Sequence, residues 1–292
     1  MSKTKIKRLI PLTFDLAFKK MFGDEEHKER TAILISTFLD IPYEEIVDSI
    51  ELINTEKRLT NKKDKTGATD IVAKIKVVFS TNERINLEMN MQFNQTKVDR
   101  NIGYISQLFG NQLKGKEDYK NLEKCIQINF NDIFVDKENK VIFDRYSLKN
   151  EYNNELTQKL EIYHINIAEC SRIWYNNDIE KYPKKLQKEI IFGALLMEKD
   201  YERFKEVLEE VSMNDSLKEN ILDTTEEFSE DEDFAYLWYD KEQNDRAILN
   251  GTIAEERENE RKKIARTMID KNMDINLISE LTSLSIEELK KL

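Results

Sequence analysis

The chain has 292 residues, a formal net charge of −11 and a charged fraction of 35%. This acidity disfavours broad electrostatic binding to nucleic acid, but it is compatible with a local basic groove or a metal-dependent site. With His27 and His164 as the two histidines, sites built on Ser-His, Cys-His or several His ligands are disfavoured. We therefore expect carboxylates to carry any catalysis.

Composition also bears on class and location. Glycine (7) and proline (3) are scarce, which favours long regular elements in one large domain or two smaller ones. The two cysteines, Cys125 and Cys170, fit buried thiols in a reducing compartment. The N-terminus lacks the apolar core of a signal peptide, and no window resembles a membrane span. We expect a cytoplasmic protein without membrane contact.

The first predicted elements are helical. Residues 13–23 predict an amphipathic helix with Thr13 as N-cap, and residues 27–39 predict a second. Asp15 lies off the apolar stripe in the first turn. It is either an acid that stabilises the helix dipole or an extra carboxylate near a functional site. A strand is expected over residues 46–54.

A basic segment follows that strand. It contains Lys57, Arg58, Lys62, Lys63 and Lys65. The segment is either a solvated loop or a rim that faces phosphate groups.

The segment from Asp70 to Gln92 predicts two strands joined by a polar turn. From Ile85 to Phe93, polar and apolar residues alternate, so Glu88, Asn90 and Gln92 share one strand face. The other face carries Leu87, Met89, Met91 and Phe93. A carboxylate and two amides on a largely apolar sheet are costly unless they are paired or bound to a cation. With Asp70 opening the first strand, the pattern indicates a candidate divalent-metal site.

The register of this hairpin decides whether the two acids can meet. Asp70 opposes Glu88 only if the hairpin is centred near Phe79, whereas the turn-like residues Ser80–Glu83 place the centre two or three residues later. The later centre would offset the acids by roughly 10 Å or more in a flat ladder. A bulge or strong twist would then be needed to bring them together.

A long helix is expected over residues 97–114, with Gly115 as its stop. Its predicted inward face comprises Val98, Ile102, Ile105, Leu108, Phe109 and Leu113. Arg100 and Tyr104 lie four residues apart on a neighbouring face. Arg100 is either a surface charge or a group that neutralises phosphate or orients Glu88. Strands are expected over residues 124–130, 141–146 and 160–167, which gives an α-β-β-β-α-β order in an α/β or α+β domain.

The remaining chain predicts helices over residues 180–197, 201–211 and 217–227. The acid-rich residues 226–233 indicate a solvated loop or a helix end, and residues 254–263 a charged helix. The tail predicts short helices that pack through Ile275, Ile278, Leu281, Leu284, Ile286 and Leu289. It is only loosely similar to a helix-turn-helix and has few basic residues, which favours packing or self-association. We divide the chain into residues 1–172, 173–253 and 254–292.

The hairpin has a chemical interpretation. Two carboxylates and a backbone carbonyl can hold Mg²⁺, which prefers oxygen ligands and retains several waters. A metal-bound water can attack a phosphodiester, while the cation offsets the developing negative charge. Asp70, Glu88 and the carbonyl of Met89 are the expected ligands. Asn90 would orient water or phosphate.

Several motifs in this chain resemble the PD-(D/E)XK nuclease family transposases, or Rpn-type recombination-promoting nucleases. They are DLAFKKMFG (15–23), KTGATDI (65–71), INLEMN (85–90), RNIGYISQLFGNQLKGKEDY (100–119) and, after a charged helix, the segment 264–289 with the pattern IA…M…I..IS..T.LS.EEL. The resemblance spans most of the chain and implies a restriction-endonuclease-like αβββαβ core. It also implies a DNA endonuclease that uses Mg²⁺ or Mn²⁺ and is linked to recombination or mobile elements.

The resemblance assigns roles to residues of this chain. Asp70 and Glu88 match the metal ligands, and Asp15 matches the acid of the first helix. Lys65 and Arg100 match basic positions near the site, and with Lys62 and Lys63 they form the expected DNA contacts.

One position departs from the wider pattern. Asn90 stands where the wider superfamily has lysine and where much of this branch has Gln or Asn. An amide can hydrogen-bond the attacking water but supplies no charge. Lys74 and Lys76 share a strand face with Asp70 and are candidates for the missing charge.

Two alternatives stay open. The chain is either a catalytically weak or inactive relative that acts as a binding or scaffold protein, or a structural protein whose polar strand face is paired in the core. Because cutting both strands of a duplex needs two active sites, we also expect a homodimer. Residues 254–292 are its candidate interface.

Overall fold

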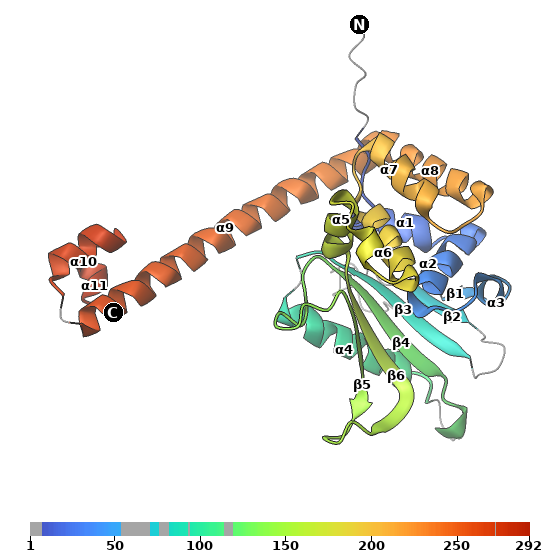
Figure 1. Ribbon diagram of the computed structural model, residues 1–292, viewed down its shortest axis with the longest axis horizontal. Coiled ribbons are helices and arrows are strands. Elements are labelled where there is room, and N and C mark those ends of the chain that lie inside the picture. Colours follow the sequence, from blue (N-terminus) through green and yellow to red (C-terminus); the bar gives the residue numbers. More distant parts are fainter. Residues whose placement is uncertain (1–7, 54–70, 76–81, 93, 114–118, 272) are drawn as a thin grey trace, which may run out of the picture. The chain divides into compact units, whose positions relative to one another are not determined.

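The computed structural model describes residues 8–53, 71–75, 82–92, 94–113, 119–271 and 273–292. Asp70, Lys62, Lys63, Lys65 and Lys76 lie outside these ranges. The chain divides into two compact units, Met1–Asp231 and Glu232–Leu292, which we describe separately. The first unit contains the predicted nuclease domain and much of the predicted helical region (Figure 1).

The first unit is built on a six-stranded sheet of order β1-β2-β3-β4-β6-β5. The strands are β1 (Glu51–Ile53), β2 (Ile71–Ile75), β3 (Glu83–Asn90), β4 (Lys124–Asn131), β5 (Phe143–Lys149) and β6 (Glu155–Asn166). Strands β3, β4 and β6 run parallel to one another, and the other pairs are antiparallel. With α1 (Asp15–Phe22) before β1 and α4 (Gln95–Gly110) between β3 and β4, the predicted αβββαβ order is confirmed.

Helices cover both faces of the sheet. On one face, Phe130 of β4 lies 5.8 Å from the Phe18 ring of α1 and 5.1 Å from the Phe38 ring of α2 (Glu29–Leu39). On the other face, α4 packs Ile105 and Leu108 onto Val72 and Cys125 (Figure 1). Because strand side chains alternate, the face under α4 is the one that also carries Glu88 and Asn90.

The hairpin has the register that the metal-site hypothesis required. Ile71 pairs with Leu87, and Ile75 pairs with Glu83, so the pairing is centred on position 79. The later centre inferred from the turn-like residues Ser80–Glu83 was therefore wrong, because pairing already begins at Glu83. Asn90 ends β3, so Met91 and Gln92 follow the strand and do not extend it.

Several predicted boundaries were wrong. Helix α1 begins at Asp15 with Phe14 at its N-cap, and the buried Thr13 lies one residue before the cap. Residues 43–47 form a short helix, α3 (Tyr43–Val47), and among the described residues the first strand is Glu51–Ile53. Ile46 and Ile50 are both buried, and the Ile50 N–H donates to the Ile46 carbonyl at 2.9 Å, which is the backbone contact of a helical turn.

The inward face of α4 also differs from the prediction. Ile102 is 48% exposed and Leu113 is 44% exposed, whereas Asn101 is buried with Ile105 and Leu108. The helix ends at Gly110, earlier than predicted. The face of α4 that packs on the sheet is thus rotated by about one residue from the predicted apolar face. It includes the amide of Asn101.

Helices α5 (Ile167–Tyr175), α6 (Lys184–Met197), α7 (Tyr201–Glu210) and α8 (Asp215–Glu230) complete the first unit. Gly193 lets α6 approach α5, since a Cβ there would lie 2.8 Å from Cys170 Sγ. Both cysteines are free and buried, as expected. Of the two interpretations of residues 226–233, the helix end is confirmed, because α8 continues to Glu230 and is anchored by the fully buried Phe228.

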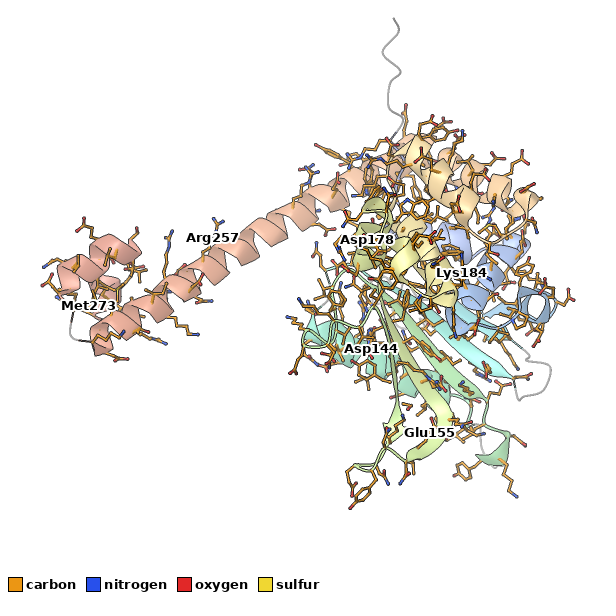
Figure 2. The ribbon with its side chains drawn as sticks, in the orientation of Figure 1. Asp144, Glu155, Asp178, Lys184, Arg257 and Met273 are labelled. Carbon is orange, nitrogen blue, oxygen red and sulfur yellow. The ribbon has the colours of Figure 1, made fainter. Side chains whose placement is uncertain are left out.

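The second unit contains α9 (Glu232–Asp270), α10 (Ile275–Thr282) and α11 (Ile286–Leu289). The turn after α9, where Figure 2 labels Met273, is followed by α10, and Ala265, Ile278, Leu284 and Leu289 form the core. Leu281 (58% exposed) and Ile286 (39% exposed) were wrongly assigned to this core. Among the described helices, none combines the length and hydropathy needed to cross a membrane.

Candidate functional site

The connection between β3 and α4 reverses the chain, so that α4 packs on the sheet next to β3. Gln92 adopts the left-handed conformation with φ 57°, and its N–H donates to the Asp132 carboxylate at 2.6 Å. Asn94 then caps α4 by accepting from the Lys97 N–H at 3.2 Å. Lys97 also donates from its ammonium group to the Met91 carbonyl. The sharp turn returns α4 across the sheet, so its first turns lie over the end of β3.

Arg100 of α4 contacts both polar residues at the end of β3. Its Nη2 lies 2.5 Å from Glu88 Oε1 and 2.6 Å from Asn90 Oδ1. Glu88 is fully buried and its side chain is 1% exposed, whereas the Arg100 side chain is 39% exposed. The guanidinium also lies 5.7 Å from the centroid of the Tyr104 ring. A fixed buried carboxylate thus faces a cation that reaches solvent.

An amide network continues from Asn90 across the sheet. Asn90 Nδ2 donates to Asn129 Oδ1 at 3.3 Å, and Gln127 Nε2 donates to the same oxygen at 3.0 Å. Asn129 Nδ2 donates to the Tyr163 carbonyl at 3.1 Å, and Asn86 Nδ2 donates to Gln127 Oε1 at 2.8 Å. These side chains lie together because β3 and β4 are parallel, with Glu88 beside Asn129.

His164 belongs to the same polar face. Its Nδ1 lies 3.0 Å from Asn131 Nδ2, so the imidazole accepts a hydrogen bond there when it is neutral. Burial lowers the pKa of His164 to about 4, against a smaller raising effect of Asp144. Asp144, labelled in Figure 2, pairs with His164 in the register of β5 and β6. His164 is therefore a neutral hydrogen-bond acceptor at pH 7.

The structure brings together three of the predicted site residues: Glu88, Asn90 and Arg100. Met89 lies between the first two in β3, and its side chain is buried on the opposite face. Asp15 opens α1, whose Phe18 packs on that opposite face. Asp70 and the predicted basic rim lie outside the described residues.

Lys74 lies away from Glu88. It pairs with Arg84 in the β2–β3 register, four residues before Glu88 and therefore roughly 13 Å along the strand. Its ammonium group forms an ion pair with Glu123 at 2.8 Å, and Arg84 contacts the same carboxylate at 2.5 Å. These contacts hold the pKa of Glu123 down at about 2, against the raising effect of its burial. Lys74 therefore belongs to an ion-pair cluster with Arg84 and Glu123, separate from Glu88.

Sequence reasoning missed the amides of β4. Gln127, Asn129 and Asn131 alternate with three apolar residues in the same way as Glu88 and Asn90. That alternation was a usable signal. A neighbouring α4 amide, Asn101, is 1% exposed, and neither of its side-chain polar atoms has a hydrogen-bond partner among the described residues.

The donor set suits a hard divalent cation. Glu88 Oε1 and Asn90 Oδ1 are oxygens that converge on one positively charged nitrogen, and Mg²⁺ and Mn²⁺ prefer oxygen ligands. Within the described part of the chain, no cluster of three or more His, Cys, Asp or Glu side chains is arranged to hold a metal. Completing a metal site would therefore require further ligands, such as a residue outside that part.

Comparison with known proteins gave two family matches. Residues 12–251 match the model of the PD-(D/E)XK nuclease family transposases. Residues 258–292 match the C-terminal HTH domain of the Rpn/YhgA-like nuclease family. The second match favours the helix-turn-helix interpretation of the tail over the packing role that the sequence analysis preferred. No curated protein and no solved structure gave a significant match.

Proposed function

Because the chain belongs to the PD-(D/E)XK nuclease family transposases, we propose that it is a Mg²⁺-dependent DNA endonuclease linked to recombination or mobile elements. The observation that carries this proposal is the buried carboxylate of Glu88, which lies beside Asn90 and under Arg100 at the end of β3. A fully buried carboxylate among hydrogen-bonding side chains is costly to maintain, and such an arrangement is typical of functional sites.

In this proposal Asp70, Glu88 and the Met89 carbonyl hold the cation, with Mn²⁺ as a substitute for Mg²⁺. Support comes from the observed register. Asp70 directly precedes Ile71, Ile71 pairs with Leu87, and Glu88 directly follows Leu87. A divalent cation bound there would supply Lewis-acid charge and a water of lowered pKa.

The chain's own residues take the remaining roles. Asn90 is oriented by Asn129, and Arg100 provides positive charge where a phosphate group would approach. Lys62, Lys63 and Lys65 are the proposed DNA-facing rim, and Asp15 is a proposed further acid. The tail, which matches an HTH domain, is a second candidate for DNA contact.

The direct test is nicking of supercoiled plasmid by purified protein in Mg²⁺. We expect Asp70→Asn and Glu88→Gln each to lower the nicking rate at least 100-fold. A loss of about this size follows the removal of one group that stabilises charge in a transition state. Glu155→Gln changes an exposed carboxylate of β6, labelled in Figure 2, and serves as the charge-matched control. If Glu88→Gln cuts as fast as Glu155→Gln, the proposed site is wrong.

One observation favours the alternative of a non-catalytic binding protein. The Arg100 guanidinium already contacts the two β3 oxygens, and no lysine follows Glu88 in the motif. Calorimetric titration separates the two functions, since the alternative expects no Mg²⁺ or Mn²⁺ binding to the folded protein.

We also propose a homodimer, because each strand of a duplex requires its own cut. The candidate interface remains residues 254–292. A chain ending near Ile253 removes this segment and keeps the first compact unit whole. Light scattering should give a dimer mass for the full chain and a monomer mass for the shortened one. A dimer mass for both would remove the tail as the interface.

A further inference from the structure

The amide network fixes which way Asn90 faces. The Tyr163 backbone carbonyl can only accept, so Asn129 turns its NH₂ group toward it, with Nδ2 at 3.1 Å. Asn129 Oδ1 then faces β3, where it accepts from Asn90 Nδ2 at 3.3 Å. The Asn90 amide is thereby oriented with its oxygen, Oδ1, toward Arg100, 2.6 Å from Nη2.

This orientation gives Asn90 a role different from that of a lysine. A lysine at this position would present a positive donor, whereas Asn90 presents a carbonyl-type oxygen. Glu88 Oε1 lies 2.5 Å from the same Arg100 nitrogen. Two oxygens, one anionic and one neutral, therefore converge on a single cationic atom. Oxygen pairs of this kind are also ligands for divalent cations.

We propose that Arg100 and the divalent cation compete for the oxygens of Glu88 and Asn90, and that a nucleic-acid phosphate relieves this competition by binding Arg100. This inference rests on the proposed function and deepens it. Asn90 becomes an additional oxygen ligand, and Arg100 becomes a positioning residue that couples the binding of metal and DNA.

The two sides of the contact between Arg100 and the β3 residues Glu88 and Asn90 differ in how freely their side chains can move. Glu88 and Asn90 are 0% and 1% exposed and are held within the sheet, so they cannot leave the site easily. Arg100 lies on the surface of α4 with its side chain 39% exposed, beside the Tyr104 ring. An arginine prefers a bidentate contact with phosphate. The guanidinium is thus the group that moves when a cation and a phosphate are both present.

Thermodynamic linkage makes this testable. If phosphate binding removes Arg100 from the two oxygens, DNA must raise the affinity for the cation, and the cation must raise the affinity for DNA by the same factor. Removing the guanidinium should therefore raise the basal cation affinity and abolish most of the coupling.

The experiment is calorimetric titration of Mn²⁺ into the full-length protein, with and without a short phosphorothioate DNA duplex. We expect Arg100→Gln to bind Mn²⁺ at least fivefold more tightly than wild type, within the usual range of coupling. DNA should tighten Mn²⁺ binding at least fivefold in wild type and less than twofold in the variant. Asn90→Leu, which removes the second oxygen, should weaken Mn²⁺ binding in the absence of DNA.

Arg172→Gln is the matched control, since Arg172 is an exposed arginine paired with Glu169 on α5. If Arg100→Gln binds Mn²⁺ no more tightly than Arg172→Gln while wild type binds normally, the competition is wrong and the proposed function stands. If neither wild type nor Arg100→Gln binds Mn²⁺, the metal site itself fails. Binding by Arg100→Gln alone supports the competition in its strongest form.

Discussion

Arg100 Nη2 lies 2.5 Å from Glu88 Oε1, which joins an exposed helical cation to a carboxylate that is fully buried in the sheet. The contact exists because the left-handed Gln92 and the Asn94 cap turn α4 back over β3. The contact places positive charge beside Asn90, the residue that stands where the pattern of the wider superfamily has lysine. The stability of the fold and the binding of a cation are therefore expected to depend on each other.

Removing that charge should make stability depend on metal. In a chelator, we expect Arg100→Gln to lower the free energy of unfolding by about 3 kcal/mol, because a buried carboxylate loses its guanidinium partner. Saturating Mn²⁺ should restore most of the loss, since a ligand that binds the native state stabilises it. Urea titrations with and without Mn²⁺ measure both values. Equal midpoints for the variant in both conditions would contradict this expectation.

His164 predicts a specific loss of stability in acid. Burial lowers its pKa from 6.5 to about 4, so between these pH values the unfolded chain binds more protons than the native chain. The free energy of unfolding should fall as the pH drops from 6.5 toward 4, by about 3 kcal/mol from this group. His164→Gln carries a neutral side chain at every pH, so it lacks this loss. Urea titrations of both proteins should give similar stabilities near pH 7 and curves that diverge in acid, with wild type less stable by about 3 kcal/mol near pH 4.

Glu189 of α6 predicts the opposite pH dependence. Burial raises its pKa to about 7, against a lowering effect of Lys185, and Asp40 adds to the rise. Between the ordinary pKa of 4.5 and about 7, the native chain holds the extra proton, so stability falls as the pH rises. We expect Glu189→Gln to exceed wild type by about 3 kcal/mol at pH 8 and to equal it near pH 4. The exposed Glu219→Gln in α8 is the control and should show no such trend.

Two glycines predict stability changes of opposite sign. A Cβ at Gly193 would lie 2.8 Å from both Cβ and Sγ of Cys170, so Gly193→Ala should destabilise the α5–α6 packing by about 1–3 kcal/mol. At Gly103 in α4 a Cβ meets no atom within 4 Å, so Gly103→Ala should stabilise by about 1 kcal/mol. Thermal unfolding of the two variants measures the contrast. A loss of stability in both would mean that α4 requires its glycine for another reason.

The order of elements and the core of the site could be predicted from local patterns. The alternation from Ile85 to Asn90 is a property of neighbouring residues, and it correctly placed Glu88 and Asn90 on one face. Arg100 was identified as a group able to orient Glu88, and its contact with that carboxylate is present. The αβββαβ order followed from the same kind of local pattern.

The rest depends on contacts between distant segments. Asn129 lies beside Glu88 because β3 and β4 pair in parallel in one register. The alternation within β4 does not reveal which residue of β3 lies next to Asn129. The inward position of Asn101 was missed because the inward face of α4 was predicted from its apolar residues alone, and an amide is not part of that pattern. The composition of residues 226–233 left a loop and a helix end open, and the buried contact of Phe228 decides for the end of α8.

The most direct test of the central claim is calorimetric titration of Mn²⁺ into wild type, Asp70→Asn and Glu88→Gln. The claim is that Asp70 and Glu88 hold one cation together, so we predict one site per chain in wild type. Each variant should lose at least tenfold in affinity, about 1.4 kcal/mol or more. Glu155→Gln, tested beside them, should bind as wild type does. Wild-type affinity in either Asp70→Asn or Glu88→Gln would contradict the account.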